Sequence, residues 1–385
     1  MFTSAVTLFL GGWNMGATGA LLPYIEKAYG LDYSEVAILF ICTFLGYTVA
    51  ALSIGPASRR IGYGPTLICA VVFGLVGSIL NSCQQASFVP MCFGFCFFGF
   101  AFAGELSLIN AYFALLPKPL VYTGVLHGIF GLGAFASPLV ATTMVTKGVP
   151  YHFFYMTCLG MSVPVLALVW FSFRTLHSLP QTPEEIISTT RQYGLRDTLR
   201  SRTVWTLALF EMFYVGAEES IGGWIVTYVL KVRNGSPSSA SWVASTFYLG
   251  LAVGRMVLPV LNVRMGERRA VFVYLAFALA LEAIAWAVPS YSSTAAATAL
   301  IGLAVSTFYT AGIVMASHLV PRSMHADAFS VMCSIGQSGS AFFPLIVGII
   351  ATKKGIWVVE PAVVALLAAS GVMWFLAPSR PIHSA

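Results

Sequence analysis

The chain has 385 residues, of which 58% are hydrophobic and 9% are charged, and its mean hydropathy is +0.84. A soluble domain carries roughly 25% charged residues, so this chain has too few charges to cover a surface exposed to water. The composition excludes a soluble enzyme, a nucleic-acid-binding protein and a disordered protein, and the net charge of +6 is too small to indicate a nucleic-acid partner. We therefore expect the lipid bilayer to surround the protein.

Long apolar runs, interrupted by glycine, proline and charge, predict two sets of six membrane-spanning helices, each long enough to cross a bilayer. The first set covers residues 3–26, 35–57, 66–83, 88–116, 120–146 and 151–175. The second set covers residues 203–230, 238–261, 268–289, 292–320, 324–352 and 355–377. The chain is thus predicted to be an all-α membrane protein with an N-terminal half (1–175), a cytoplasmic linker (176–202) and a C-terminal half (203–385).

The distribution of Lys and Arg predicts the orientation of these helices. Thirteen of the twenty residues fall on the side of the linker, six fall on the opposite side, and Arg255 lies inside a span. Because cytoplasmic loops carry the excess of positive charge, both chain ends are predicted to be cytoplasmic. We expect the protein in the plasma membrane rather than in an internal membrane.

The two halves are related by a sequence repeat. An offset of 204 residues relates positions in several helices and loops, and an offset of 206 relates two further pairs. The matched pairs are Gly12 with Gly216, Asn14 with Glu218, Gly19 with Gly223, Arg60 with Arg264, Gly62 with Gly266, Gly133 with Gly339 and Pro138 with Pro344. Repeated halves of a transporter place the solute site at their interface near the membrane midplane.

Loop and helix motifs add a family resemblance. The segment 55–62, Gly-Pro-Ala-Ser-Arg-Arg-Ile-Gly, resembles the signature loop of the major facilitator superfamily. Segment 263–269 is the corresponding loop of the second half. Segments 127–138, 216–228 and 248–255 look like the fifth, seventh and eighth helices of the fucose-permease-like branch of that superfamily, especially its fungal members. Arg59 stands where the signature loop normally has Asp, and Glu105 stands five rather than four positions before Asn110.

The resemblance implies transport by rocking of two halves, so polar side chains inside the spans become candidates for the solute site. Ionisable groups are expensive in a bilayer and usually face a cavity or a partner. The expected solute-binding residues are Asn14, Glu105, Asn110, His127, Glu218, Trp224 and Gln337. Glu218 is about 22 Å from the start of its predicted helix, and we expect it to meet Asn14 and Glu105 in one cavity. Glu218 is the preferred proton carrier, with Glu105 and His127 as alternatives; each of these side chains also has a purely structural interpretation.

Two further predictions concern charged groups nearer the linker. Arg60, Gly62, Arg264 and Gly266 are interpreted as gating-loop residues, in which the glycines form tight turns. Arg255 is predicted to form a buried ion pair with Glu211, because Glu218 is about 10 Å deeper along the same helix and so beyond easy reach.

These patterns favour a secondary active transporter, a proton symporter for a sugar or a similar small polar solute, expected to be a monomer. An exporter or antiporter of small organic molecules, and a nutrient sensor that moves no solute, are the alternatives. The sequence contains no nucleotide-binding loop, nucleophile elbow or zinc-protease motif. An enzyme is therefore not expected, nor is a cofactor or a metal.

Overall fold

The computed structural model describes residues 1–83, 86–117, 119–179 and 195–378, and this part of the chain is helical throughout, without strands. Its first seven helices are α1 (Phe2–Tyr29), α2 (Tyr33–Val36), α3 (Ile38–Ile61), α4 (Tyr63–Ser82), α5 (Val89–Ala114), α6 (Pro119–Thr146) and α7 (His152–Phe173). The others are α9 (Leu195–Arg200), α10 (Arg202–Lys231), α11 (Pro237–Met265), α12 (Glu267–Ala287), α13 (Tyr291–Val305), α14 (Phe308–Leu319), η1 (Arg322–Met324), α15 (His325–Lys354), η2 (Ile356–Val358) and α16 (Val359–Leu376). Residues 180–194 of the predicted linker lie outside the described residues.

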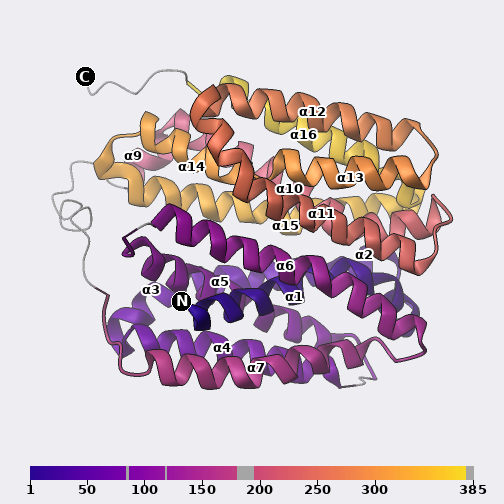
Figure 1. Cartoon of the computed structure of the whole chain (residues 1–385), viewed down its shortest axis with the longest axis horizontal. Helices are drawn as coiled ribbons and strands as arrows, with labels where there is room; N and C mark the ends of the chain where they lie inside the picture. The colour runs from indigo at the N-terminus through magenta and orange to yellow at the C-terminus, as the bar shows by residue number, and fades with distance from the viewer. Residues whose placement is uncertain (84–85, 118, 180–194, 379–385) are drawn as a thin grey trace.

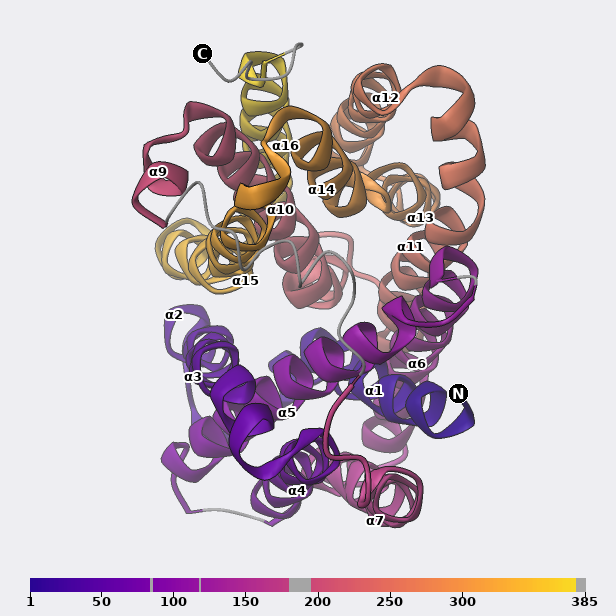
Figure 2. The same cartoon turned by 90° about the vertical axis from the view of Figure 1, so that its left-hand side faces the viewer.

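The long helices run alongside one another in two groups, which Figures 1 and 2 show as α1–α7 below and α9–α16 above. Each group contains very close helix pairs, among them α1 with α6 and α10 with α15. A Cβ atom built on Gly12 would lie 1.9 Å from the carbonyl oxygen of Phe130, and one built on Gly339 would lie 2.0 Å from that of Met212. Glycine at these positions of the repeat therefore allows the two equivalent pairs to approach backbone to backbone.

Eleven helices of the described chain are long and apolar enough to cross a membrane, whereas twelve spans were predicted. The remaining long helix, α10, has 30 residues and runs among the others, but it carries Glu211, Glu218 and Glu219. The predicted tenth span is continuous in sequence yet broken in the structure at Ser306 and Thr307, between α13 and α14. The first difference arises from the three carboxyl groups of α10, which lower the hydropathy of that helix.

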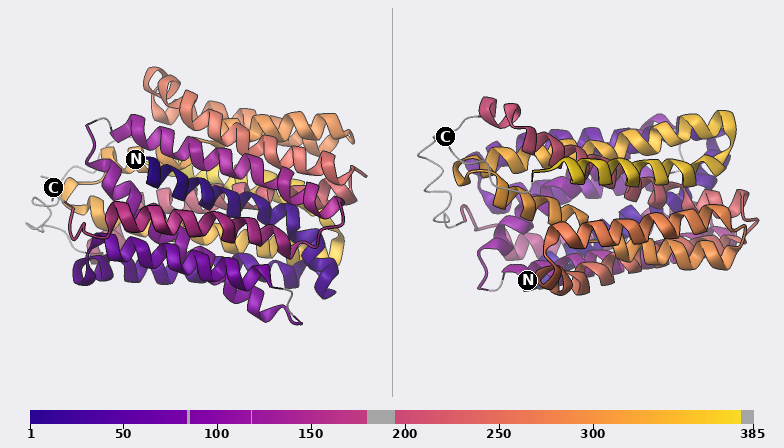
Figure 3. Two further views of the ribbon diagram at one scale, coloured as in Figure 1. Left: turned by 60° about the horizontal axis from the view of Figure 1, so that its bottom comes forward. Right: turned by 90° about the horizontal axis from the view of Figure 1, so that it is seen from above.

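Helix α1 begins and α16 ends at one end of the bundle, where α9 also lies; this end is called here the linker side, and the opposite end is the far side (Figure 3). Two tight turns on the linker side join α3 to α4 and α11 to α12. Gly62 and Gly266 occupy these turns with φ of 98° and 81°. Positive φ is readily adopted only by glycine, so the predicted turn role of both residues is confirmed.

Specific contacts between the two groups gather toward the far side. The backbone N–H of Ser34 on α2 donates to the hydroxyl of Thr352 on α15, at 3.0 Å. Asp32 caps α2 and so orients Ser34; hydrogen bonds from the Ser34 hydroxyl and the Glu35 N–H hold the pKa of Asp32 below its usual value. Deeper in the bundle, a Cβ atom on Gly19 would lie 2.0 Å from the carbonyl oxygen of Gly222. The far side is therefore closed by direct contact between the groups.

Candidate functional site

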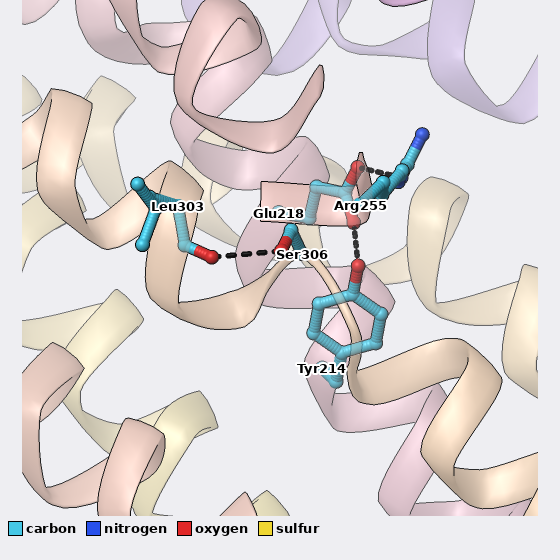
Figure 4. Close-up of polar contacts among 5 residues, drawn as sticks. All are labelled: Tyr214, Glu218, Arg255, Leu303 and Ser306. Atoms are coloured by element: carbon cyan, nitrogen blue, oxygen red, sulfur yellow. Dashed lines mark hydrogen bonds and ion pairs between the residues drawn. The ribbon is translucent and has the colours of Figure 1, made fainter. Parts of the chain in front are cut away.

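The centre of the candidate site is an ion pair between α10 and α11. The guanidinium of Arg255 lies 3.2 Å from one carboxylate oxygen of Glu218, and the hydroxyl of Tyr214 donates to the other oxygen (Figure 4). The Glu218 side chain is 9% exposed and the Arg255 side chain 25% exposed. The carboxylate is thus satisfied on both oxygens, while part of the Arg255 side chain remains exposed.

The predicted pair between Glu211 and Arg255 is wrong, because Arg255 binds Glu218 instead. Along the observed helices Glu218 is about 24 Å from the linker-side end of α10, and Arg255 about 15 Å from that of α11. Helical side chains tilt toward the N-terminus of their own helix. Because α10 and α11 are antiparallel, Glu218 and Arg255 tilt toward each other, whereas Glu211 tilts away from Arg255.

The ion pair lies next to the seam between the two groups, where α6 packs along α11. A Cβ atom on Gly131 of α6 would lie 2.5 Å from the Cβ of Ala252, and one on Gly128 would lie 3.2 Å from the sulfur of Met256, the neighbour of Arg255. His127, also on α6, is partly exposed and lies within electrostatic range of Arg255. The structure therefore places both predicted residues, Glu218 and His127, near Arg255.

The break between α13 and α14 lies against the same part of α11. A Cβ atom on Gly254 would lie 2.2 Å from the hydroxyl oxygen of Ser306, and Figure 4 shows Ser306 beside the ion pair. The Ser306 hydroxyl donates a hydrogen bond to the carbonyl oxygen of Leu303 at 2.7 Å, while the buried hydroxyl of Thr307 has no partner in the described chain. Irregular backbone at membrane depth is characteristic of transporter binding sites, and neither proline nor glycine stands at the break itself to signal this one.

Glu105 does not join Glu218. The Glu105 side chain is 6% exposed, and a Cβ atom built on Gly74 of α4 would lie 3.9 Å from one of its oxygens. Figure 2 shows α4 and α7 on the side of the N-terminal group farthest from the C-terminal group. The expected cavity shared by Asn14, Glu105 and Glu218 is therefore not formed in this structure.

The predicted uncharged ligands are separated from one another. Asn14 on α1 and Asn110 on α5 are each partly exposed, and each has a buried side-chain oxygen without a hydrogen-bond partner among the described residues. Gln337 on α15 is partly exposed and lies one turn from Cys333, on the same helical face. Each of the three keeps unused hydrogen-bonding capacity, and none of them bonds to Glu218.

Trp224 is not open to a solute in this structure. The ring is fully buried, and its Nε1 donates to the carbonyl oxygen of Pro344 at 3.0 Å. The ring packs edge-on against Tyr33 and contacts Phe40, with centroids 5.8 and 6.2 Å away. Trp224 of the C-terminal group therefore belongs to the far-side closure against α2 and α3 of the N-terminal group.

The predicted gating arginines lie on the linker side. Arg60 and Arg264 are exposed, and within the described chain neither makes a hydrogen bond or an ion pair. The arginine with a clear structural role in the second loop is Arg268, which donates to the carbonyl oxygens of Ala377, Pro378 and Phe375 at the end of α16. Sequence reasoning missed this role, and it also missed Tyr214, although Tyr214 precedes Glu218 by one helical turn.

Comparison with known proteins decides the family. The family model of the Major Facilitator Superfamily matches residues 4–236 and 213–385. The chain belongs to this superfamily. It is a multi-pass membrane transporter rather than an enzyme, and the predicted superfamily is confirmed.

Two curated relatives match nearly the full chain. "Bypass of stop codon protein 6" of Saccharomyces cerevisiae is 23% identical over 95% of this chain and 80% of its own length. A "Glucose/galactose transporter" of Brucella abortus is 23% identical over 90% of this chain and 86% of its own length.

Solved structures confirm the fold. A mutant of the nucleoside transporter NupG superposes with a TM-score of 0.75 at 14% identity, covering 98% of both chains. A mutant of the Escherichia coli fucose:proton symporter FucP superposes with a TM-score of 0.69 at 14% identity, again over 98% of both chains.

Proposed function

We propose that this protein carries a sugar or a similar small polar solute across the membrane together with a proton. The observation that carries the proposal is the buried ion pair of Glu218 and Arg255, beside the seam between the two helix groups. The glucose/galactose transporter of Brucella abortus supports the solute class, and the fold shared with a fucose:proton symporter supports proton coupling.

Glu218 has the chemistry needed for a coupling group. As a carboxylate it neutralises Arg255, so the pair adds no net charge to the dry interior. Binding of a proton removes that attraction and releases the guanidinium, whose planar array of N–H donors suits the hydroxyl groups of a sugar. Arg255 is the more exposed member of the pair, so its side chain is the one that a solute in the adjacent space would meet first.

The linker side is proposed to face the cytoplasm, with the protein in the plasma membrane as a monomer. The excess of Lys and Arg on this side supports that orientation. The far-side contacts, among them Ser34 with Thr352 and Tyr33 with Trp224, then form the outer gate. In this interpretation the structure is the state closed to the outside, and alternating access requires these contacts to separate.

The proposed role of Glu218 can be tested in vesicles containing the purified protein, with glucose and galactose as the first solutes. Exchange of labelled solute at equal pH is compared with uptake driven by a pH gradient. Glu218→Gln imitates the protonated side chain, so we expect exchange to persist and pH-driven accumulation to be lost. Glu219→Gln is the matched control on the adjacent, partly exposed carboxyl group, and it should retain both activities.

The same assay separates the alternatives. Accumulation by Glu218→Gln equal to that of the unaltered protein would exclude Glu218 as the coupling group. Solute movement against the proton gradient would favour an antiporter, and binding without any exchange would favour a sensor. Glu218→Gln combined with Arg255→Gln removes both charges, so its failure to couple cannot be attributed to an unpaired arginine.

A further inference from the structure

A second buried carboxyl group, that of Glu211 on α10, is separate from the ion pair. The side chain is 0% exposed, and neither carboxylate oxygen has a hydrogen-bond partner among the described residues. A Cβ atom built on Gly312 of α14 would lie 2.5 Å from one oxygen, and one on Gly336 of α15 would lie 3.2 Å from the other. The carboxyl group therefore fills a slot that exists because two neighbouring helices have glycine there.

The groups that face this slot do not stabilise a negative charge. Tyr309 of α14 and Cys333 of α15 are titratable side chains within electrostatic range of Glu211, and neither is hydrogen-bonded to it. Of the nearby ionisable groups on α10 and α11, Glu218 and Arg255 are paired with each other, and the Tyr214 hydroxyl is used by Glu218. An unpaired carboxylate in a dry site costs several kcal/mol, so this slot favours the neutral carboxylic acid form of Glu211.

Polar side chains near Glu211 extend toward the seam between the helix groups. The hydroxyl of Tyr309 donates to the sulfur of Cys333 at 2.9 Å. Tyr47 of α3, which is partly exposed and belongs to the N-terminal group, lies within electrostatic range of both of them. Tyr309 lies in the first turn of α14, directly after the break in the helix. These side chains therefore lie on both sides of the contact between α3 and α15, which must change when the groups rock.

We propose that Glu211 is a proton-binding site of the C-terminal group, loaded through Tyr47, Cys333 and Tyr309 and distinct from Glu218. When α3 and α15 separate, water reaches these side chains, and the carboxyl group of Glu211 releases its proton to water. When they close, the dry slot restores the neutral acid. The proposal deepens the proposed function and rests on its alternating access, but proton binding at Glu211 can be measured without any solute.

Infrared spectroscopy provides that measurement, because the C=O stretch of a protonated carboxyl group is separate from the carboxylate bands. Spectra of the purified protein in lipid nanodiscs are recorded from acid to alkaline pH. We expect Glu211→Gln to lose one protonated-carboxyl band that disappears on raising the pH in the unaltered protein. Glu218→Gln, the matched control on the same helix, should keep that band. Tyr309→Phe should keep the band and shift the midpoint of its titration.

Two results would overturn the proposal. One is a Glu211→Gln spectrum identical to that of the unaltered protein; the other is a Glu211 band that stays unchanged over the whole pH range, which would make Glu211 a permanently neutral packing group. If Glu211→Gln does not fold, the test uses Tyr309→Phe and Cys333→Ser instead. The proposal is then overturned if the band titrates with the same midpoint in both variants as in the unaltered protein. Because no solute is present, failure of sugar uptake would not affect this outcome.

Discussion

The ion pair of Glu218 and Arg255 makes a quantitative prediction about stability. The two charged atoms are 3.2 Å apart, which corresponds to a Coulomb energy of about 5 kcal/mol at an effective dielectric constant of about 20. Desolvation offsets part of this attraction, and removing one partner of a buried pair typically costs about 3–5 kcal/mol. Arg255→Met, which keeps the apolar stem, and Glu218→Gln, which keeps the shape, should each lower the free energy of unfolding by an amount in this range.

The double variant tests whether these losses share one cause. Because each single change leaves the other partner uncompensated, we expect the double variant to lose at least about 2 kcal/mol less than the sum of the singles. Unfolding of the detergent-solubilised protein, followed by intrinsic tryptophan fluorescence, gives the four free energies. Glu211→Gln combined with Arg255→Met is the matched control and should be additive. The pairing of Glu218 with Arg255 would be refuted if the effects of Glu218→Gln and Arg255→Met were additive while those of Glu211→Gln and Arg255→Met were not. That result would support the pair of Glu211 and Arg255 predicted from the sequence.

Three further predictions concern turns, packing and orientation. Gly266→Ala places a Cβ at φ 81° and ψ 135° with no atom within 4 Å, so the free energy of unfolding should fall by about 1–3 kcal/mol from backbone strain alone. Gly12→Ala should lower the free energy of unfolding far more, since its Cβ would meet a carbonyl oxygen at 1.9 Å. Gly160→Ala is the control: its Cβ would have no neighbour within 4 Å, so this change should be neutral or stabilising in the same unfolding assay. In a background without exposed cysteines, Ser238→Cys should react with an impermeant thiol reagent in intact cells and Arg59→Cys should not; the reverse pattern would invert the orientation.

Individual residues show where sequence reasoning succeeded. The helices follow from run length, since a backbone in lipid must satisfy its own hydrogen bonds. The repeat correctly linked Gly12 with Gly216 and Gly133 with Gly339, because close helix packing requires the same small residues in both groups. It also linked Gly62 with Gly266, whose positive φ excludes most other residues. These features depend on local backbone geometry and on patterns that recur along the chain.

The partner of each buried charge was decided only by the tertiary structure. Depth along a helix placed Glu211 nearer to Arg255, but the opposite tilt of side chains on antiparallel helices brought Glu218 to the guanidinium instead. The rotation of α5 turned Glu105 toward Gly74 rather than the seam, and the packing of α2 and α3 buried Trp224. The sequence determined which polar groups enter the membrane, because inserting them has a cost that depends on residue type. Which of them meet depends on the rotation and tilt of neighbouring helices, and these are set by contacts between residues far apart in the chain.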